Sequence, residues 1–259
     1  MAFPLLGVSA AFAFLIALWA IQRRTQDAAT ADAGWATLVA AGSICAAVTI
    51  PGDATRRTLV AALATIWALR LAWYLLADRV LSGRAEDGRY RALREKWGAN
   101  AQWNFLLLYL AQGVFATLFV LPVATAMRGG PLDAFAALGV LIWLVAVAGE
   151  TIADRQLAAF RADTSTKGRV CQVGFWKYSR HPNYFFEWLQ WFSYVAIGHA
   201  ALLTWLGPAL MLLFLFRLTG IPYTERQALA SRGDAYRTYQ RTTSPFIPWP
   251  PRPDPEVSR

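Results

Sequence analysis

Phe105 to Met127 reads FLLLYLAQGVFATLFVLPVATAM, a run that contains no charged side chain. A bilayer-spanning helix needs about 20 consecutive, mostly apolar residues, because a backbone in lipid must satisfy its own hydrogen bonds. This run is long enough to cross a membrane as one helix. It ends at Arg128-Gly129-Gly130-Pro131, where glycine and proline favour a helix stop.

The whole chain has the same apolar character. Of its 259 residues, 56% are hydrophobic and 16% are charged, whereas a soluble globular chain carries roughly 25% charged residues. This composition excludes an ordinary soluble domain and a disordered chain. Cys45 and Cys171 give neither a metal-binding spacing nor a disulfide framework, so we expect no metal site. We infer no nucleic-acid partner and no obligate protein partner.

Further apolar runs accompany the first. They predict spans over 4–21, 34–50, 59–77, 105–127 and 134–152, and a pair of short spans within 184–217. The pair would be joined by a tight hairpin near Gly198-His199. Because arginines follow the first run and none precedes it, we expect a retained span there and no cleaved signal. We predict an all-α integral membrane protein of about seven transmembrane helices, forming a single membrane domain over 1–259.

The basic residues set the expected topology. When the loops are assigned alternately to two sides, 21 of the 25 Lys and Arg residues fall on one side and three on the other, with Arg70 inside a span. The positive-inside rule then places the N-terminus outside and the C-terminus in the cytoplasm. Spans 1–3 occupy 1–77, spans 4–5 occupy 105–152 and spans 6–7 occupy 184–218. The loop 78–104, the loop 153–183 and the tail 219–259 would be cytoplasmic.

The loop 153–183 carries a pattern that suits an anionic ligand. Between 167 and 187, basic residues stand among glycines and six aromatic residues. Guanidinium groups bind phosphates, and glycines allow close backbone approach, so a nucleotide cofactor is one interpretation. A loop attracted to anionic lipid is the other.

Ionisable residues at membrane depth strengthen the functional interpretation. Glu187 begins a span, Glu150 and Asp154 share a helix face, and Arg70 shares a face with Tyr74. Such residues are costly in lipid and are often functional. The alternatives are ion pairs with neighbouring arginines, or snorkelling of Arg70.

The roles of two further segments stay open. A helix over the tail would place Tyr236 beside Tyr239 and Arg237 beside Arg241, either as a lid over a cofactor or as an interfacial amphipathic helix. The stretch 83–98 is expected to form a short charged helix, whose simplest interpretation is a solvated surface helix.

Gly174 to Glu187 reads GFWKYSRHPNYFFE and resembles the C-terminal signature of the steroid 5-alpha-reductase superfamily. Three segments together resemble domain-of-unknown-function family 1295 within that superfamily. These segments are 86–90 with Trp97-Gly98, the Arg-His-Pro-Asn-Tyr run, and 225–249. The resemblance implies a bacterial inner-membrane enzyme that binds NADPH from the cytoplasm and reduces a carbon–carbon double bond in a lipophilic substrate.

The resemblance also implies a set of cofactor-binding positions. Carried over to this chain, they are Arg70, Tyr74, Asp154, Arg161, Arg169, Tyr178, Arg180, His181, Asn183, Glu187 and Glu225. Arginines would bind phosphates, while amide and carboxylate groups would bind the amide and ribose ends of the cofactor.

One departure from the steroid reductases concerns the proton donor. Their second span carries a Gln-Glu pair and their third a tyrosine, but 34–50 here has neither Gln nor Glu, and Trp67 aligns with the tyrosine. Reduction of an enone builds charge on oxygen, so a donor is still required. The nearest replacements are Asp32, Tyr109 and Gln112, which we take as the candidate catalytic residues.

Two other classes of function remain open. Isoprenylcysteine carboxyl methyltransferases have a similar Arg-His-Pro-x-Tyr run followed by a glutamate, here Glu225, and bind S-adenosylmethionine. Asn183, the spacing of Asp154 and Arg161 and the Glu86-Asp87 loop fit the reductases better. A non-catalytic lipid-binding protein is the third possibility, favoured by the missing Gln-Glu pair.

Overall fold

The computed structural model describes residues 2–81, 83, 85–218 and 220–254. Within this part of the chain the secondary structure is helical, and one isolated bridge pairs Ser179 with Ser244. Among the described residues, five helical segments are long and apolar enough to cross a membrane, namely Thr30–Thr49, Ala54–Val80, Gly88–Ala126, Ala134–Ala162 and Leu202–Arg232. The predicted all-helical class is confirmed, and the apolar helices indicate a membrane protein.

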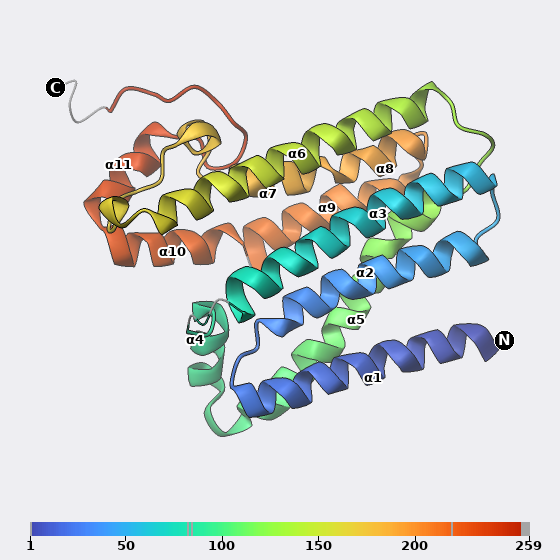
Figure 1. Ribbon diagram of the computed structural model, residues 1–259, viewed down its shortest axis with the longest axis horizontal. Coiled ribbons are helices and arrows are strands. Elements are labelled where there is room, and N and C mark those ends of the chain that lie inside the picture. The colour runs from blue at the N-terminus through green and yellow to red at the C-terminus, as the bar shows by residue number, and fades with distance from the viewer. Residues whose placement is uncertain (1, 82, 84, 219, 255–259) are drawn as a thin grey trace. The chain divides into compact units, whose positions relative to one another are not determined.

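The chain divides into two compact units, and the first consists of Met1–Leu132 and Ala201–Leu206. Its elements are α1 (Ala2–Thr25), α2 (Thr30–Thr49), α3 (Ala54–Leu75), the π-helical turn η1 (Leu76–Val80), α4 (Gly88–Trp97), η2 (Gly98–Asn100), α5 (Ala101–Ala126) and η5 (Leu202–Trp205). Helix α2 packs against α3 and α5, and α1 packs against α5, which crosses behind them in Figure 1.

The second unit consists of Asp133–Ala200 and Gly207–Arg259. Its elements are α6 (Ala134–Ala162), η3 (Thr164–Thr166), η4 (Gly174–Lys177), α7 (Pro182–Leu189), α8 (Trp191–Ile197), most of α9 (Leu206–Leu213), η6 (Phe214–Leu218), α10 (Ile221–Arg232) and α11 (Asp234–Thr242). Helix α6 packs along both α7 and α8, and α10 contacts η6 and α11.

Arg56 ties two loops of the first unit together. Its side chain is buried, and it donates from Nε to the carbonyl oxygen of Gly130 at 2.8 Å and from Nη2 to that of Pro131 at 2.9 Å. Asp53 caps the N-terminus of α3 by accepting from the Arg56 amide at 2.9 Å. The loops that follow α2 and α5 are therefore fixed to each other by hydrogen bonds.

Close packing of α6 depends on two glycines. A Cβ atom at Gly139 would lie 2.5 Å from Ile197 on α8, and one at Gly149 would lie 2.5 Å from the Phe186 ring on α7. Small residues at a helix interface let two helices approach closely. The van der Waals contacts formed in this way help to hold helices together in lipid.

The segment 184–218 turns where the sequence predicts a hairpin. Gly198 to Ala200 form the turn, and His199 Nε2 lies 2.8 Å from Asp133 Oδ2. Helices α7 and α8 have eight and seven residues, which is shorter than the roughly 20 that a spanning helix needs, whereas α9 belongs to the longer helical segment Leu202–Arg232. The number of spans in this segment, and the total of seven, therefore stay predictions.

Candidate functional site

A polar cluster lies on the buried face of the second unit where α6 meets α7. Glu150 and Asp154, one helical turn apart on α6, are 3% and 6% exposed. The Asn183 amide donates from Nδ2 to Asp154 Oδ1 at 3.1 Å. Glu187 follows Asn183 by one turn of α7 and is half-buried. The structure thus brings together Asp154 and Asn183, two of the predicted cofactor-binding residues, beside the buried Glu150.

Arg180, His181 and Glu225 meet in a second cluster, which we name the tail clamp. Arg180 donates from Nε to Glu225 Oε1 at 2.7 Å and from Nη1 to the carbonyl oxygens of Gln240 and Thr243 at 2.8 and 2.9 Å. Gln240 donates from Nε2 to Glu225 Oε2 at 3.0 Å. These bonds join the loop before α7 to α10 and α11.

His181 is the third member of the tail clamp. Its Nε2 lies 3.4 Å from Glu225 Oε1, and its ring stacks on Tyr184 at a centroid distance of 5.3 Å. Burial lowers the pKa of His181 below its ordinary value, although the neighbouring Glu225 carboxylate opposes this shift. At neutral pH the imidazole is therefore uncharged.

The segment after α11 closes over the same loop. Ser179 donates from Oγ to the Phe246 carbonyl at 2.7 Å, and the Trp249 amide donates to the Tyr178 carbonyl at 2.9 Å. Tyr239 donates from its hydroxyl to the Trp176 carbonyl, and burial raises its pKa above the ordinary value. The face that the sequence predicts for Tyr236 and Tyr239 is confirmed, since both are buried.

The remaining predicted residues of the second unit lie at its surface. Arg161 at the end of α6 and Arg169 in the following loop are exposed, and Tyr178 is 40% exposed. The Arg169 carbonyl accepts from Arg232 Nε at 2.9 Å, which attaches this loop to the end of α10. The side chains of Arg161 and Arg169 are therefore placed where a phosphate in solution can reach them.

Arg70 and Tyr74 belong to the first unit. They lie one turn apart on α3, and both side chains are half-buried. Tyr109 and Gln112 share a face of α5 in the same unit. The Tyr109 hydroxyl is buried, 2.6 Å from Thr30 Oγ1 and 3.3 Å from the Ala28 carbonyl oxygen.

Asp32 lies in an ion-pair network of the first unit. It accepts from Arg79 Nη1 at 2.7 Å, Arg89 Nη2 at 2.8 Å and the Tyr90 hydroxyl at 2.7 Å. Burial by itself raises the pKa of the neighbouring Asp87, but the guanidiniums of Arg89 and Arg79 overcome this effect and hold the pKa below its ordinary value. Through its three hydrogen bonds, the Asp32 carboxylate joins α2, η1 and α4.

Glu86 extends this ion-pair network to the loop after α1. It accepts from Arg94 Nη2 and from the Ala28 amide, at 2.8 and 3.0 Å. The Glu86-Asp87 segment, which the sequence suggests as part of a family motif, thus fixes the loop before α4 to the start of α2.

Sequence reasoning missed Gln190 and Tyr194, which lie one turn apart around the break between α7 and α8. Both are fully buried. Among the described residues, neither the Gln190 amide group nor the Tyr194 hydroxyl has a hydrogen-bond partner. The available signal was a glutamine inside a nearly unbroken apolar run. No group of three or more His, Cys, Asp or Glu residues that could bind a metal ion occurs in the described part of the chain.

Comparison with known proteins identifies the family. Residues 18–243 match the family described as "Protein of unknown function (DUF1295)". The chain belongs to this family. An uncharacterized protein of Schizosaccharomyces pombe is 26% identical over 266 residues, which cover 89% of this chain and 75% of the relative. No solved structure gives a significant match. The family membership that the three motif segments predict is confirmed.

Proposed function

We propose that this chain is a membrane-embedded, NADPH-dependent reductase of a carbon–carbon double bond in a lipophilic substrate of the sterol-like, enone or isoprenoid kind. The observation that carries this proposal is the polar end of α6. Asp154, bonded to Asn183, is buried beside Glu150 where α6 meets α7, and Arg161 follows seven residues later at the exposed end. Seven residues make two helical turns, or about 10.5 Å, so the two side chains share a face.

The polar side chains of the second unit fit a dinucleotide. Asn183, Asp154 and Glu187 offer the amide and carboxylate groups that bind a carboxamide and ribose hydroxyls. Arg161 and Arg169 offer guanidiniums that bind phosphates in a bidentate manner. When bound, NADPH would supply a hydride to the substrate.

The proposal gives other residues supporting roles. Arg180 and His181 both contact Glu225 and position the start of α7, which carries Asn183. Asp32, Tyr109 and Gln112 stay the proposed proton donors. Asp32 accepts from two arginines and a tyrosine, and the Tyr109 hydroxyl contacts Thr30 and the Ala28 carbonyl.

A methyltransferase that uses S-adenosylmethionine is the second candidate. It is favoured by the contact of Arg180 and His181 with Glu225, because these two parts of the methyltransferase-like pattern are far apart in sequence and meet in space. A non-catalytic lipid-binding protein would bind neither cofactor.

The membrane arrangement completes the proposal. The superfamily resemblance and the distribution of basic residues support seven spans, an external N-terminus and a cytoplasmic C-terminus. The bacterial inner membrane inferred from the resemblance stays a proposal, and the relative in Schizosaccharomyces pombe extends this similarity to a eukaryote.

Thermal unfolding of the full chain in detergent tests the proposal. A ligand that binds the folded state at 100 times its Kd stabilises it by about 2.7 kcal/mol. NADPH is expected to raise the melting temperature, and Arg169→Ala and Asn183→Ala should reduce that increase. Arg91→Ala, at an exposed position of α4, is the matched control and should respond as the wild type does.

The same measurement separates the alternatives. Stabilisation by S-adenosylmethionine alone would overturn the reductase proposal in favour of the methyltransferase. A response to NADPH that survives both Arg169→Ala and Asn183→Ala would show that the cofactor binds elsewhere. Stabilisation by neither cofactor would favour the lipid-binding alternative.

A further inference from the structure

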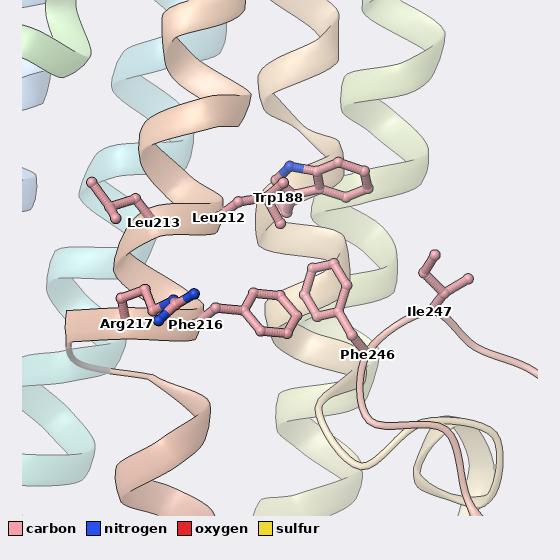
Figure 2. Close-up of a pocket in the computed structure, with 7 residues that line it drawn as sticks. All are labelled: Trp188, Leu212, Leu213, Phe216, Arg217, Phe246 and Ile247. Carbon is pink, nitrogen blue, oxygen red and sulfur yellow. The ribbon is translucent and has the colours of Figure 1, made fainter.

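A groove of about 480 Å³ opens on the second unit, apart from the polar cluster of α6 and α7 (Figure 2). Helix α9 and η6 form one wall, α7 contributes an indole, and the segment after α11 forms the other wall. Its apolar lining consists of Trp188, Leu212, Leu213, Phe216, Phe246 and Ile247.

Protein contacts fix the aromatic lining in place. Trp188 donates from Nε1 to the Pro208 carbonyl at 3.2 Å. The Phe246 ring packs against Trp188 and Phe216 at centroid distances of 5.6 and 5.2 Å. The Phe246 carbonyl in turn accepts from Ser179 Oγ. The aromatic side of the groove is therefore held by hydrogen bonds and ring contacts within the second unit.

Arg217 supplies the one cation of this lining. It lies in η6, one turn after Leu213, and its side chain is exposed. Within the described residues, no hydrogen bond or ion pair of Arg217 is found. A guanidinium beside an apolar surface suits a ligand that joins an anionic group to a hydrocarbon chain.

The position of the groove along the helix identifies the surrounding medium. Leu212 to Arg217 belong to Leu202–Arg232, one of the segments long and apolar enough to cross a membrane. Leu213 and Ile247 are 47% and 56% exposed, and such apolar exposure is favourable in lipid. Arg217 follows the apolar stretch at the end where charged residues begin, which is the depth of lipid headgroups.

We propose that this groove binds an anionic bilayer phospholipid. An acyl chain would lie against Trp188, Phe216 and Phe246, and the phosphate would pair with Arg217. This site does not depend on any cofactor or catalytic step, so it stands whether or not the reductase proposal holds.

Native mass spectrometry of the full chain in detergent, with phosphatidylglycerol and phosphatidylcholine of identical acyl chains, tests the site. The added anionic attraction at one arginine predicts about fivefold tighter binding of phosphatidylglycerol. Arg217→Gln should abolish this preference, because phosphatidylglycerol loses a net charge attraction, whereas the phosphate of phosphatidylcholine is already offset by its choline cation and loses less. Arg226→Gln, which removes an exposed arginine of α10 outside the groove, is the matched control and should preserve the preference.

A second variant tests the apolar part of the groove. Leu213→Trp fills it from a half-exposed position and should weaken both lipids equally, and the melting temperature of each variant checks that it is folded. Equal binding of the two lipids by the wild type, or an unchanged preference in Arg217→Gln, would overturn the proposal.

Discussion

Replacing Glu225 by alanine is expected to destabilise the second unit by removing the acceptor at the centre of the tail clamp. Glu225 Oε1 lies 2.7 Å from Arg180 Nε and 3.4 Å from His181 Nε2, and Oε2 accepts from Gln240 at 3.0 Å. These three side chains would lose their acceptor together. Because they come from the loop before α7 and from α11, the contact between distant parts of the chain is weakened.

The size of the expected loss in stability follows from the burial of this ion pair. The side chains of Arg180 and Glu225 are only 10% and 16% exposed, so water cannot fully replace the lost carboxylate. Removing one partner of a buried ion pair costs about 3–5 kcal/mol. Arg180 keeps its bonds to the carbonyls of Gln240 and Thr243, which places the expected loss near the lower limit, about 3 kcal/mol.

Thermal unfolding in detergent measures this loss. For a domain of 150–250 residues, about 3 kcal/mol corresponds to a decrease of roughly 6–12 °C in melting temperature. Glu225→Gln retains an acceptor oxygen and should melt between Glu225→Ala and the wild type. Asp234→Ala is the control, because it removes a carboxylate from an exposed pair with Arg237. If Glu225→Ala melted together with this control, the tail clamp would not stabilise the unit as argued.

Three further changes are accessible to the same assay. Burial lowers the pKa of His181 below 6.5, so the unfolded chain takes up the proton first as the pH falls. Stability should therefore decrease below pH 6.5 by up to about 1.4 kcal/mol per pH unit. His181→Gln should remove this slope, whereas His199→Gln should keep it. Gly149→Ala places a Cβ 2.5 Å from a phenylalanine ring and should cost about 1–3 kcal/mol. Arg89→Ala and Asp32→Asn should each destabilise the first unit, and the double variant should cost less than the sum, as a double-mutant cycle will show.

The helices could be predicted because their signals are local. An apolar run bounded by glycine, proline or charge marks a long helix wherever the chain places it, as 105–127 and 134–152 do for α5 and α6. The charged helix expected within 83–98 is present as α4. The additional break at Gln190, between α7 and α8, was harder to predict, because no proline or glycine stands beside it.

The candidate site was only partly predictable, because pairing between charges depends on tertiary structure. The sequence identifies Asp154, Asn183 and Glu225 as unusual, yet it does not show that Asn183 bonds to Asp154 while Glu225 bonds to Arg180. Asp32 illustrates the same limit. The sequence shows a lone acid at a helix start, but not the arginines of η1 and α4 that donate to it.

The segment after α11 connects the two proposals for the second unit. Through Ser179 and Phe246 it fixes the loop that leads to Asn183, and through Phe246 it also lines the lipid groove. Loosening the tail clamp by Glu225→Ala should therefore weaken both NADPH binding and the binding of both lipids. Arg217→Gln should affect the lipid alone, because Arg217 lies outside the polar cluster of α6 and α7. If Arg217→Gln lost NADPH binding as well as the lipid preference, the groove and the cofactor residues would form one site. If Glu225→Ala kept both NADPH binding and lipid binding, the segment after α11 would not support either site.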